Sequence, residues 1–501
     1  MKGPAPRGRG VRMSFNTIPY LLFLPLALLG YFAVPPRLKA WWLAGANCAF
    51  YAFCAAPGLA LFLLAAALAS YAGARAMQAA PRRKKVWLAL ALAADLGLLC
   101  FFKYNGFFPA LVQGMAGLGL PASSGRLLMP LGISYYTFST VSYLADVYRG
   151  RLAAERSFLY YFLYCSFFAY ITAGPICRAG DILPQFKAPQ SFEYARTIRA
   201  LRLMLVGYFK KIAVADVLVR FVDAVYGDVY AYTGGVLTLA ALGYGLYLYA
   251  DFSGYSDLAR GSALLLGLRL PENFCTPYFA ATLGEFWNRW HISLSTWLKD
   301  YIYIPLGGSR RGRARRCFNL LAVFLASGLW HGVGWGFIVW GLLHGLGRVA
   351  ETILARGQKT PPPAGAARWV RWALTFVFVN VCWVFFRLPT LGEAAHLLTA
   401  QFAPGGFAAQ CASAIAAGFD ATPLLMAGYA AFCTVAVGLL ALLDGWRHFG
   451  LEDGPLEDGI AALRPAARWA LYYLLLALVF AAFIMQNGNY VGNVSFAYGG
   501  F

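Results

Sequence analysis

Charged side chains are scarce in this chain of 501 residues. Only 13% of the residues are Asp, Glu, Lys or Arg, whereas 60% are hydrophobic and 17% are aromatic. Soluble globular domains average about 25% charged residues, so the shortage of charge excludes an ordinary soluble protein. The composition predicts a polytopic integral membrane protein.

Several short motifs of common enzyme classes are also missing. The chain has no Gly-x-x-x-x-Gly-Lys-Ser/Thr, no His-Glu-x-x-His and no Gly-x-Ser-x-Gly. Their absence removes local support for P-loop phosphoryl transfer, zinc hydrolysis and a serine-hydrolase elbow. The ten cysteines include no Cys-x-x-Cys pair, and most lie in apolar runs, as small buried hydrophobic residues do. We therefore expect neither a metal site nor a disulfide framework.

The chain is rich in apolar runs long enough to cross a bilayer, which takes about 20 helical residues. These runs lie at 17–34, 40–57, 58–78, 86–103, 127–146, 158–174, 234–250, 318–347, 368–387, 423–443 and 468–486. We predict an all-α protein with about eleven to thirteen transmembrane helices plus re-entrant or amphipathic helices. The first run extends past a signal-peptide core and no small-residue cleavage site is evident, so we expect it to be retained.

Basic residues outnumber acidic residues by 42 to 21, which gives a formal net charge of +21. They cluster at 82–85, at 310–316 and at the pair Lys210 and Lys211. In one interpretation these are cytoplasmic loops that follow the positive-inside rule. In another, part of this surface docks an acidic partner or the phosphates of a nucleotide-containing donor. Nucleic acid is a poor third choice, because the clusters lie between spans and no nucleic-acid module is recognisable.

The organisation along the chain is that of a single membrane domain over 1–501, without a convincing internal repeat. We divide it into N-terminal spans at 1–94, a central body at 95–355, a linker at 356–367 and C-terminal spans at 368–501. The linker contains three successive prolines, which cannot continue a helix. The central body holds the two most informative histidines of the five in the chain.

The first of these, His291, lies in a segment rich in tryptophan. Trp287, Trp290 and Trp297 follow a helical spacing with an adjoining polar stripe that contains Asn288, His291 and Ser295. This pattern predicts one amphipathic helix. The tryptophans either anchor that helix at the membrane interface or hold His291 rigidly, with Asn288 and Ser295 one turn away on either side.

The second histidine, His331, lies in the charge-free run 318–347. A helix that starts near Phe318 would carry His331 about 20 Å into the membrane core, where a titratable group is costly. His331 is either hydrogen-bonded to a neighbouring helix or serves as a general base or orienting group. His344 is expected to be a packing or supporting residue, and His396 and His448 are assigned no role.

The order of several motifs resembles the membrane-bound O-acyltransferase family. They are Phe102-Lys-Tyr-Asn105, Met129-Pro-Leu-Gly-Ile-Ser-Tyr-Tyr-Thr-Phe138, Ala173-Gly-Pro-Ile176, Phe209-Lys-Lys-Ile-Ala-Val-Ala-Asp216, Asp251-Phe-Ser-Gly-Tyr-Ser-Asp257, Arg289-Trp-His291 and Gly328-Leu-Trp-His-Gly332. The resemblance is dense over 95–350. Tyr301-Ile-Tyr-Ile-Pro-Leu-Gly-Gly308 and Phe496-Ala-Tyr498 look like the bacterial polysaccharide O-acetyltransferase branch of the alginate type.

The resemblance implies a mechanism and a set of site residues. Family members pass an acyl group from a cytoplasmic thioester through a membrane-embedded tunnel that surrounds a histidine. Carried onto this chain, that histidine is His331 and the second family histidine is His291. His331 would act as general base on an acceptor hydroxyl. We expect Trp330, Asn288 and Asp300 to support the two histidines.

The resemblance also implies substrates and partners. Acetyl-CoA would be the donor, with no metal, and a polysaccharide would be the indirect acceptor. A separate extracytoplasmic SGNH-type acyltransferase would complete the reaction at the bacterial inner (plasma) membrane, within the lipid bilayer. Two alternatives stay open. One is D-alanyl transfer to teichoic acid from an acidic acyl carrier protein, and the other is a channel or transporter, which the lack of an internal repeat disfavours.

Overall fold

The computed structural model describes residues 13–54, 57–104, 129–332, 334–354, 365–419 and 423–485. Most of the predicted linker at 356–367 lies outside the described residues, as do Asn105 and the closing motif at 496–498. The predicted division of the chain at 94, 355 and 367 therefore stays a prediction.

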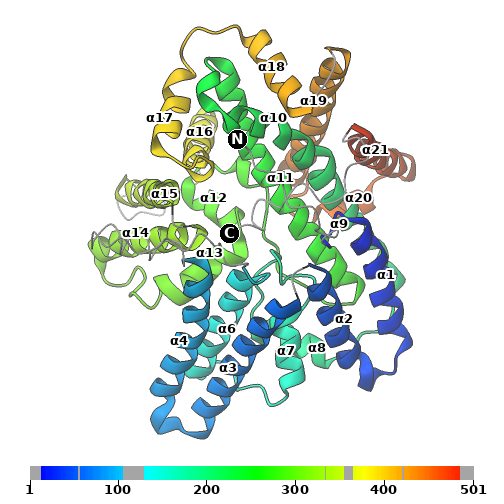
Figure 1. Ribbon diagram of the computed structural model, residues 1–501, viewed down its shortest axis with the longest axis vertical. Helices are drawn as coiled ribbons and strands as arrows, with labels where there is room; N and C mark the ends of the chain where they lie inside the picture. Colours follow the sequence, from blue (N-terminus) through cyan, green and yellow to red (C-terminus); the bar gives the residue numbers. More distant parts are fainter. Residues whose placement is uncertain are drawn as a thin grey trace. The chain divides into compact units, whose positions relative to one another are not determined.

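Most of the described residues are helical, which confirms the all-α prediction. No β-strand forms in these ranges, and the one β-bridge joins Phe274 to Trp290. The α-helices (Figure 1) are α1 (Ile18–Ala33), α2 (Lys39–Cys54), α3 (Ala60–Ala79), α4 (Lys84–Lys103), α6 (Ile133–Tyr148), α7 (Phe158–Ser166), α8 (Ala179–Lys187), α9 (Tyr194–Tyr208), α10 (Asp216–Gly227), α11 (Gly235–Leu265), α12 (Leu283–Arg289), α13 (Ile292–Leu298), α14 (Gly312–His331), α15 (Trp335–Leu354), α16 (Ala366–Arg387), α17 (Leu391–Ala400), α18 (Phe407–Phe419), α19 (Pro423–Gly445), α20 (Leu456–Ala462) and α21 (Pro465–Met485). The part of the chain that the structure describes also contains three π-helices, η4 (Phe209–Ala215), η7 (Lys299–Tyr303) and η8 (Trp446–Gly450).

Seven helices within the described ranges are long and apolar enough to cross a membrane. They are Ala60–Ala79, Pro81–Lys103, Gly235–Leu265, Trp335–Leu354, Ala366–Arg387, Met426–Gly450 and Pro465–Met485. The chain is thus a multi-pass membrane protein. Ile18–Ala33 and Phe407–Phe419 are apolar but shorter, and the larger count of eleven to thirteen spans stays a prediction.

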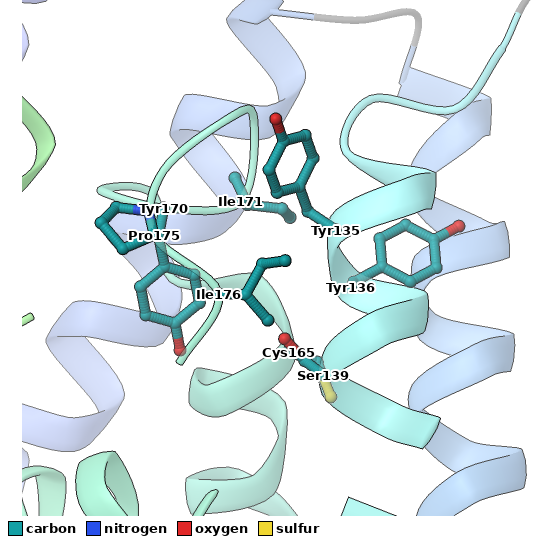
Figure 2. A pocket seen from close by; sticks show the side chains of 8 residues that line it. All are labelled: Tyr135, Tyr136, Ser139, Cys165, Tyr170, Ile171, Pro175 and Ile176. Atoms are coloured by element: carbon teal, nitrogen blue, oxygen red, sulfur yellow. The ribbon is translucent and has the colours of Figure 1, made fainter. Parts of the chain in front are cut away.

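The chain forms two compact units. The first includes the described parts of Met1–Met204 and Tyr255–Pro271, and the second is built from Leu205–Gly254 and Glu272–Met485. In the first unit α3, α4 and α6 pack against one another, and α7 packs on α2, α3 and α8. Figure 2 shows a small void of this unit beside α6, into which the side chains of Ile171 and Ile176 point. Its volume of about 10 Å³ is room for roughly one water molecule.

The second unit contains a helical hairpin that the sequence did not predict. The run 318–347 was expected to form one span, but α14 ends at His331 and α15 begins at Trp335. The two helices lie side by side (Figure 1). They approach closely because Gly328 faces the backbone of Phe337 and Gly341 faces the backbone of Phe324. The hairpin therefore places His331 at a turn, and its depth in the membrane stays a prediction.

The prediction that Lys210 and Lys211 form part of a basic loop is wrong. Both lie in the π-helix η4 and are buried, with exposed fractions of 5% and 2%. The Lys211 ammonium lies 2.5 Å from Asp251 on α11 and 2.7 Å from Asp216 on α10. Burial disfavours this ammonium, but the two carboxylates outweigh burial and raise the pKa of Lys211. The lysine therefore joins three helical elements of the second unit.

Candidate active site

His291 occupies a break between two short helices. The sequence pattern predicted one continuous amphipathic helix, yet α12 ends at Arg289 and α13 begins at Ile292. The backbone of His291 is left-handed, with φ of 44° and ψ of 54°. A non-glycine residue in this region costs about 1–3 kcal/mol and persists where surrounding contacts enforce it, often at functional sites. The strained turn makes His291 a strong functional candidate.

Buried polar groups hold this turn in place. The Ile292 amide donates to the carbonyl oxygen of Asn273 at 3.0 Å, and the Ser293 amide donates to Oδ1 of the same residue at 3.3 Å. The carbonyl oxygen of His291 accepts from the Ser295 amide at 2.9 Å. Asn273 is fully buried, so its backbone and side chain both act as fixed partners.

The His291 ring is enclosed by protein. Its exposed fraction is 1%, and it meets the ring of Phe252 edge-on at 4.7 Å between centroids. Burial lowers the pKa of His291 to about 3. The imidazole is therefore neutral near pH 7 and can accept a proton or a hydrogen bond.

His331 lies in an aromatic pocket at the end of α14. Its exposed fraction is 3%. Its ring contacts Trp330 at 4.6 Å, Phe386 of α16 at 5.0 Å and Trp340 of α15 at 5.2 Å, all nearly edge-on. Such surroundings exclude water, so a charge that develops beside His331 would interact strongly with nearby dipoles.

An aromatic cluster links the two histidine segments within the second unit. Trp290, which precedes His291, lies 5.0 Å from Trp383 of α16. Trp383 stacks on Trp340 at 5.9 Å, and Trp340 in turn contacts His331. The fold thus brings the segments of both predicted histidines to one aromatic cluster, although His291 lies between α12 and α13 and His331 ends α14.

The three predicted supporting residues have different surroundings. Trp330 is buried and contacts the His331 ring. Asn288 is exposed on α12, and Asp300 is half-buried on η7. Because the helix breaks before His291, Asn288 and Ser295 do not flank that ring by helical spacing. Ser295 instead donates its hydroxyl to the carbonyl oxygen of Trp290 at 3.2 Å. The roles of Trp330, Asn288 and Asp300 stay predictions.

His344 is a third buried histidine beside this core. Its Nδ1 accepts a hydrogen bond from the Trp287 indole at 3.3 Å, and its ring lies 5.2 Å from Trp340. His344 therefore connects α12 to α15, in keeping with the supporting role expected from its position. Within the described residues, no group of three or more His, Cys, Asp and Glu side chains could hold a metal ion.

Comparisons with known proteins give similarities over most of the chain. Residues 58–391 match a family model described as MBOAT, membrane-bound O-acyltransferase family. The chain is 38% identical over 398 residues to a probable alginate O-acetylase AlgI of Pseudomonas putida, with 78% of this chain and 81% of that relative covered. It is 35% identical over 427 residues to a peptidoglycan O-acetyltransferase of Helicobacter pylori, with 77% and 79% covered.

A more distant group of relatives is also similar. A teichoic acid D-alanyltransferase of Streptococcus thermophilus is 31% identical over 249 residues, which cover 47% of this chain and 59% of that relative. Both His291 and His331 lie inside the residues that the family model matches.

Proposed function

Because this chain belongs to the membrane-bound O-acyltransferase family, we propose that it transfers an acetyl group from acetyl-CoA for O-acetylation of an exported polysaccharide such as alginate. The similarity to the alginate and peptidoglycan O-acetyltransferases over most of the chain supports this acceptor class. Membership of an acyltransferase family leaves the channel or transporter alternative without support. We place the protein in the bacterial inner membrane.

The observation that carries the proposal is the burial of His331 among three aromatic rings at the turn between α14 and α15. In the reaction, His331 removes the proton of an acceptor hydroxyl as its oxygen attacks the thioester carbonyl carbon. The carbon–sulfur bond then breaks, and the thiolate of coenzyme A leaves and takes up the proton. His291, neutral and fixed in its turn, orients the reacting groups.

The basic residues at 310–316 are our candidates for holding the phosphates of the donor. Arg310, Arg311 and Arg313 are exposed at and just before the start of α14. Guanidinium groups bind phosphate through paired hydrogen bonds. The same residues could instead bind an acidic carrier protein loaded with D-alanine, which is the alternative donor favoured by the similarity to teichoic acid D-alanyltransferases.

We further propose that a separate extracytoplasmic acyltransferase of the SGNH type completes transfer to the polymer. A hydrated glycan is bulky, whereas His331 is buried, so direct access of the polymer is unfavourable. The sequence has no Gly-x-Ser-x-Gly motif that could supply a second active site of the serine-hydrolase type. Reconstituted protein that efficiently acetylates a polymer without a partner would contradict this part of the proposal.

Purified protein in lipid nanodiscs, supplied with radiolabelled acetyl-CoA and a hydroxyl-bearing acceptor, tests the proposed reaction. We expect thioester turnover in the wild type and a loss of at least about a hundredfold in His331→Ala and His331→Gln, as is typical for removal of a general base. His396→Ala is the matched control, because His396 lies on α17 and packs on Tyr230. Wild-type turnover by both His331 variants would refute the assignment. Label transfer only from D-alanyl carrier protein would favour the alternative donor.

A further inference from the structure

The segment 446–454, which consists of the π-helix η8 and the four residues after it, is tied to the segment that leads into His291. Arg447 is buried and donates to the carbonyl oxygen of Phe274 at 3.3 Å and to Glu272 at 2.9 Å. Its Nε also donates to the carbonyl oxygen of Gly454 at 3.0 Å, which joins η8 to the residues that follow it. The segments 446–454 and 272–291 thus form one connected structure within the second unit.

Asp453 lies at the centre of this connection. Its Oδ2 lies 2.8 Å from Nη1 of Arg289, and its Oδ1 accepts a hydrogen bond from the Thr276 hydroxyl at 2.8 Å. The Nδ1 of His448 lies 3.0 Å from the same Oδ1. Burial alone would raise the pKa of this carboxyl, but the bonds from His448 and Thr276 and the charge of Arg289 together lower it. Asp453 is therefore an anion with three partners.

The hydrogen bonds of His448 to Arg368 and Asp453 fix the orientation of its ring. Nη2 of Arg368 lies 2.9 Å from Nε2 of His448, and a guanidinium can only donate. Nε2 is thus the acceptor, and Nδ1 carries the proton that is donated to Asp453. The ring also stacks on Phe279 at 5.1 Å. The imidazole therefore adds a directional hydrogen bond that fixes the Asp453 carboxylate.

Residues with a strained backbone lie in these same two segments, 272–291 and 446–454. Among the described residues, the non-glycine residues with positive φ are Thr276, His291, Glu452 and Asp453. Two of them, Thr276 and Asp453, are joined by a hydrogen bond. Strained residues persist where their surroundings over-determine them, and they concentrate where geometry matters for function.

Arg289 transmits this arrangement to His291. Its guanidinium also contacts the Thr276 hydroxyl at 2.9 Å and Glu285 at 3.0 Å, while its carbonyl oxygen accepts from the Cys275 amide at 3.0 Å. Both ends of Arg289 are therefore fixed, two residues before His291. The direction in which the chain enters the left-handed turn depends on these contacts.

We propose that Asp453 is a positioning residue for acyl transfer, which holds Arg289 and Thr276 and thereby orients His291. This inference rests on the proposed function, because it requires that His291 take part in the reaction. The inference also gives the C-terminal part of the second unit a role in catalysis, although that part of the chain contains neither His291 nor His331.

The variant Asp453→Asn tests this role, because it keeps the size of the side chain and removes its charge. We expect kcat for thioester turnover to fall about tenfold with KM for the donor within about twofold, as a misplaced catalytic group lowers the rate of the chemical step. Hydrogen–deuterium exchange should rise in peptides that contain Cys275 and Ile292, whose amides are bonded in the folded turn. The melting temperature should change little.

Asp223→Asn is the matched control, because Asp223 forms an ion pair with Arg387 at 2.7 Å in the same unit. It should leave kcat and exchange near Cys275 and Ile292 unchanged. Thr276→Val is a milder second variant, which removes the hydroxyl between Asp453 and Arg289, and it should change both quantities in the same direction by a smaller factor.

Unchanged kcat and unchanged local exchange in Asp453→Asn would overturn the positioning role. The positioning role would also be overturned if kcat and the melting temperature both fell while hydrogen–deuterium exchange near His291 stayed unchanged. That result would indicate a general structural role for Asp453. If the wild type itself fails to turn over a thioester, the proposed function fails, while exchange near Cys275 and Ile292 still decides whether Asp453 holds the turn.

Discussion

A β-carbon on Gly341 would lie 2.5 Å from the carbonyl oxygen of Phe324. No side chain fits at that distance, so α14 and α15 can approach as they do only because residue 341 is glycine. Gly341 follows Trp340, which contacts the His331 ring. The position of His331 against α15 therefore depends on this close backbone contact, in the way that small residues permit close helix packing in membranes.

The variant Gly341→Ala should push α14 away from α15. We expect a loss of about 1–3 kcal/mol in the free energy of unfolding and a decrease of about tenfold in turnover, measured by thermal unfolding and by the acetyl-CoA assay. Gly438→Ala on α19 is the control, because a β-carbon there meets nothing within 4 Å. Equal stability and turnover in both variants would show that the hairpin does not require the close contact.

Two variants of His291 separate its chemistry from its backbone strain. His291→Gly and His291→Ala both remove the imidazole, so both should lose most of the turnover. Glycine adopts the observed φ of 44° freely, whereas alanine is strained there. The glycine variant should thus be more stable by about 1 kcal/mol, measured by thermal unfolding. An alanine variant at least as stable as the glycine variant would argue against strain at this turn.

Removing the charge of Lys211 should destabilise the second unit strongly. Lys211→Met leaves the carboxylates of Asp216 and Asp251 buried without their shared cation, which typically costs about 3–5 kcal/mol. Lys85→Met, at an exposed position of α4, should change the free energy of unfolding by less than about 0.5 kcal/mol. Adding Asp251→Asn to Lys211→Met should recover part of the loss. Equal stabilities of Lys211→Met and Lys85→Met would contradict the buried ion cluster.

The surroundings of Glu155 indicate that the stability of the protein depends on pH. Burial raises the pKa of its carboxyl, but Lys187 at 2.5 Å and the amides of Ser157 and Arg156 outweigh burial and lower it. Because the pKa of Glu155 is lower in the folded protein, the ionised carboxyl contributes stability at pH values above its ordinary pKa of 4.5. This contribution is lost as the pH falls through the lower pKa of the folded state. The wild type should thus lose its advantage over Glu155→Gln on acidification from about pH 7 to about pH 3. A constant difference in melting temperature between the two proteins would contradict this prediction.

The broad class and the candidate histidines could be predicted from the sequence because their signals are local. Apolar runs predicted most of the helices, with α3, α4, α16 and α21 close to the expected bounds. His291 and His331 stood out because histidine is rare in this chain and because the surrounding motifs resemble those of one family. Chemical identity and short-range spacing suffice for such inferences.

Interactions between residues distant in sequence decided the rest. The helical spacing around His291 predicted a continuous helix, but Asn273 bonds two amides beyond the break and stabilises a left-handed turn there. Lys211 looked like a surface cation until the fold placed Asp216 and Asp251 beside it.

Local sequence patterns were enough to predict an all-helical membrane protein and to draw attention to His291 and His331. Only the folded chain shows that His331 lies at a hairpin turn, that an aromatic cluster connects it to the segment of His291, and that Asp453 forms an ion pair with Arg289. Hydrophobic patterning specifies which residues are buried. It does not specify which buried groups meet, because hydrogen bonds and ring contacts depend on distances that arise only when separate helices pack together.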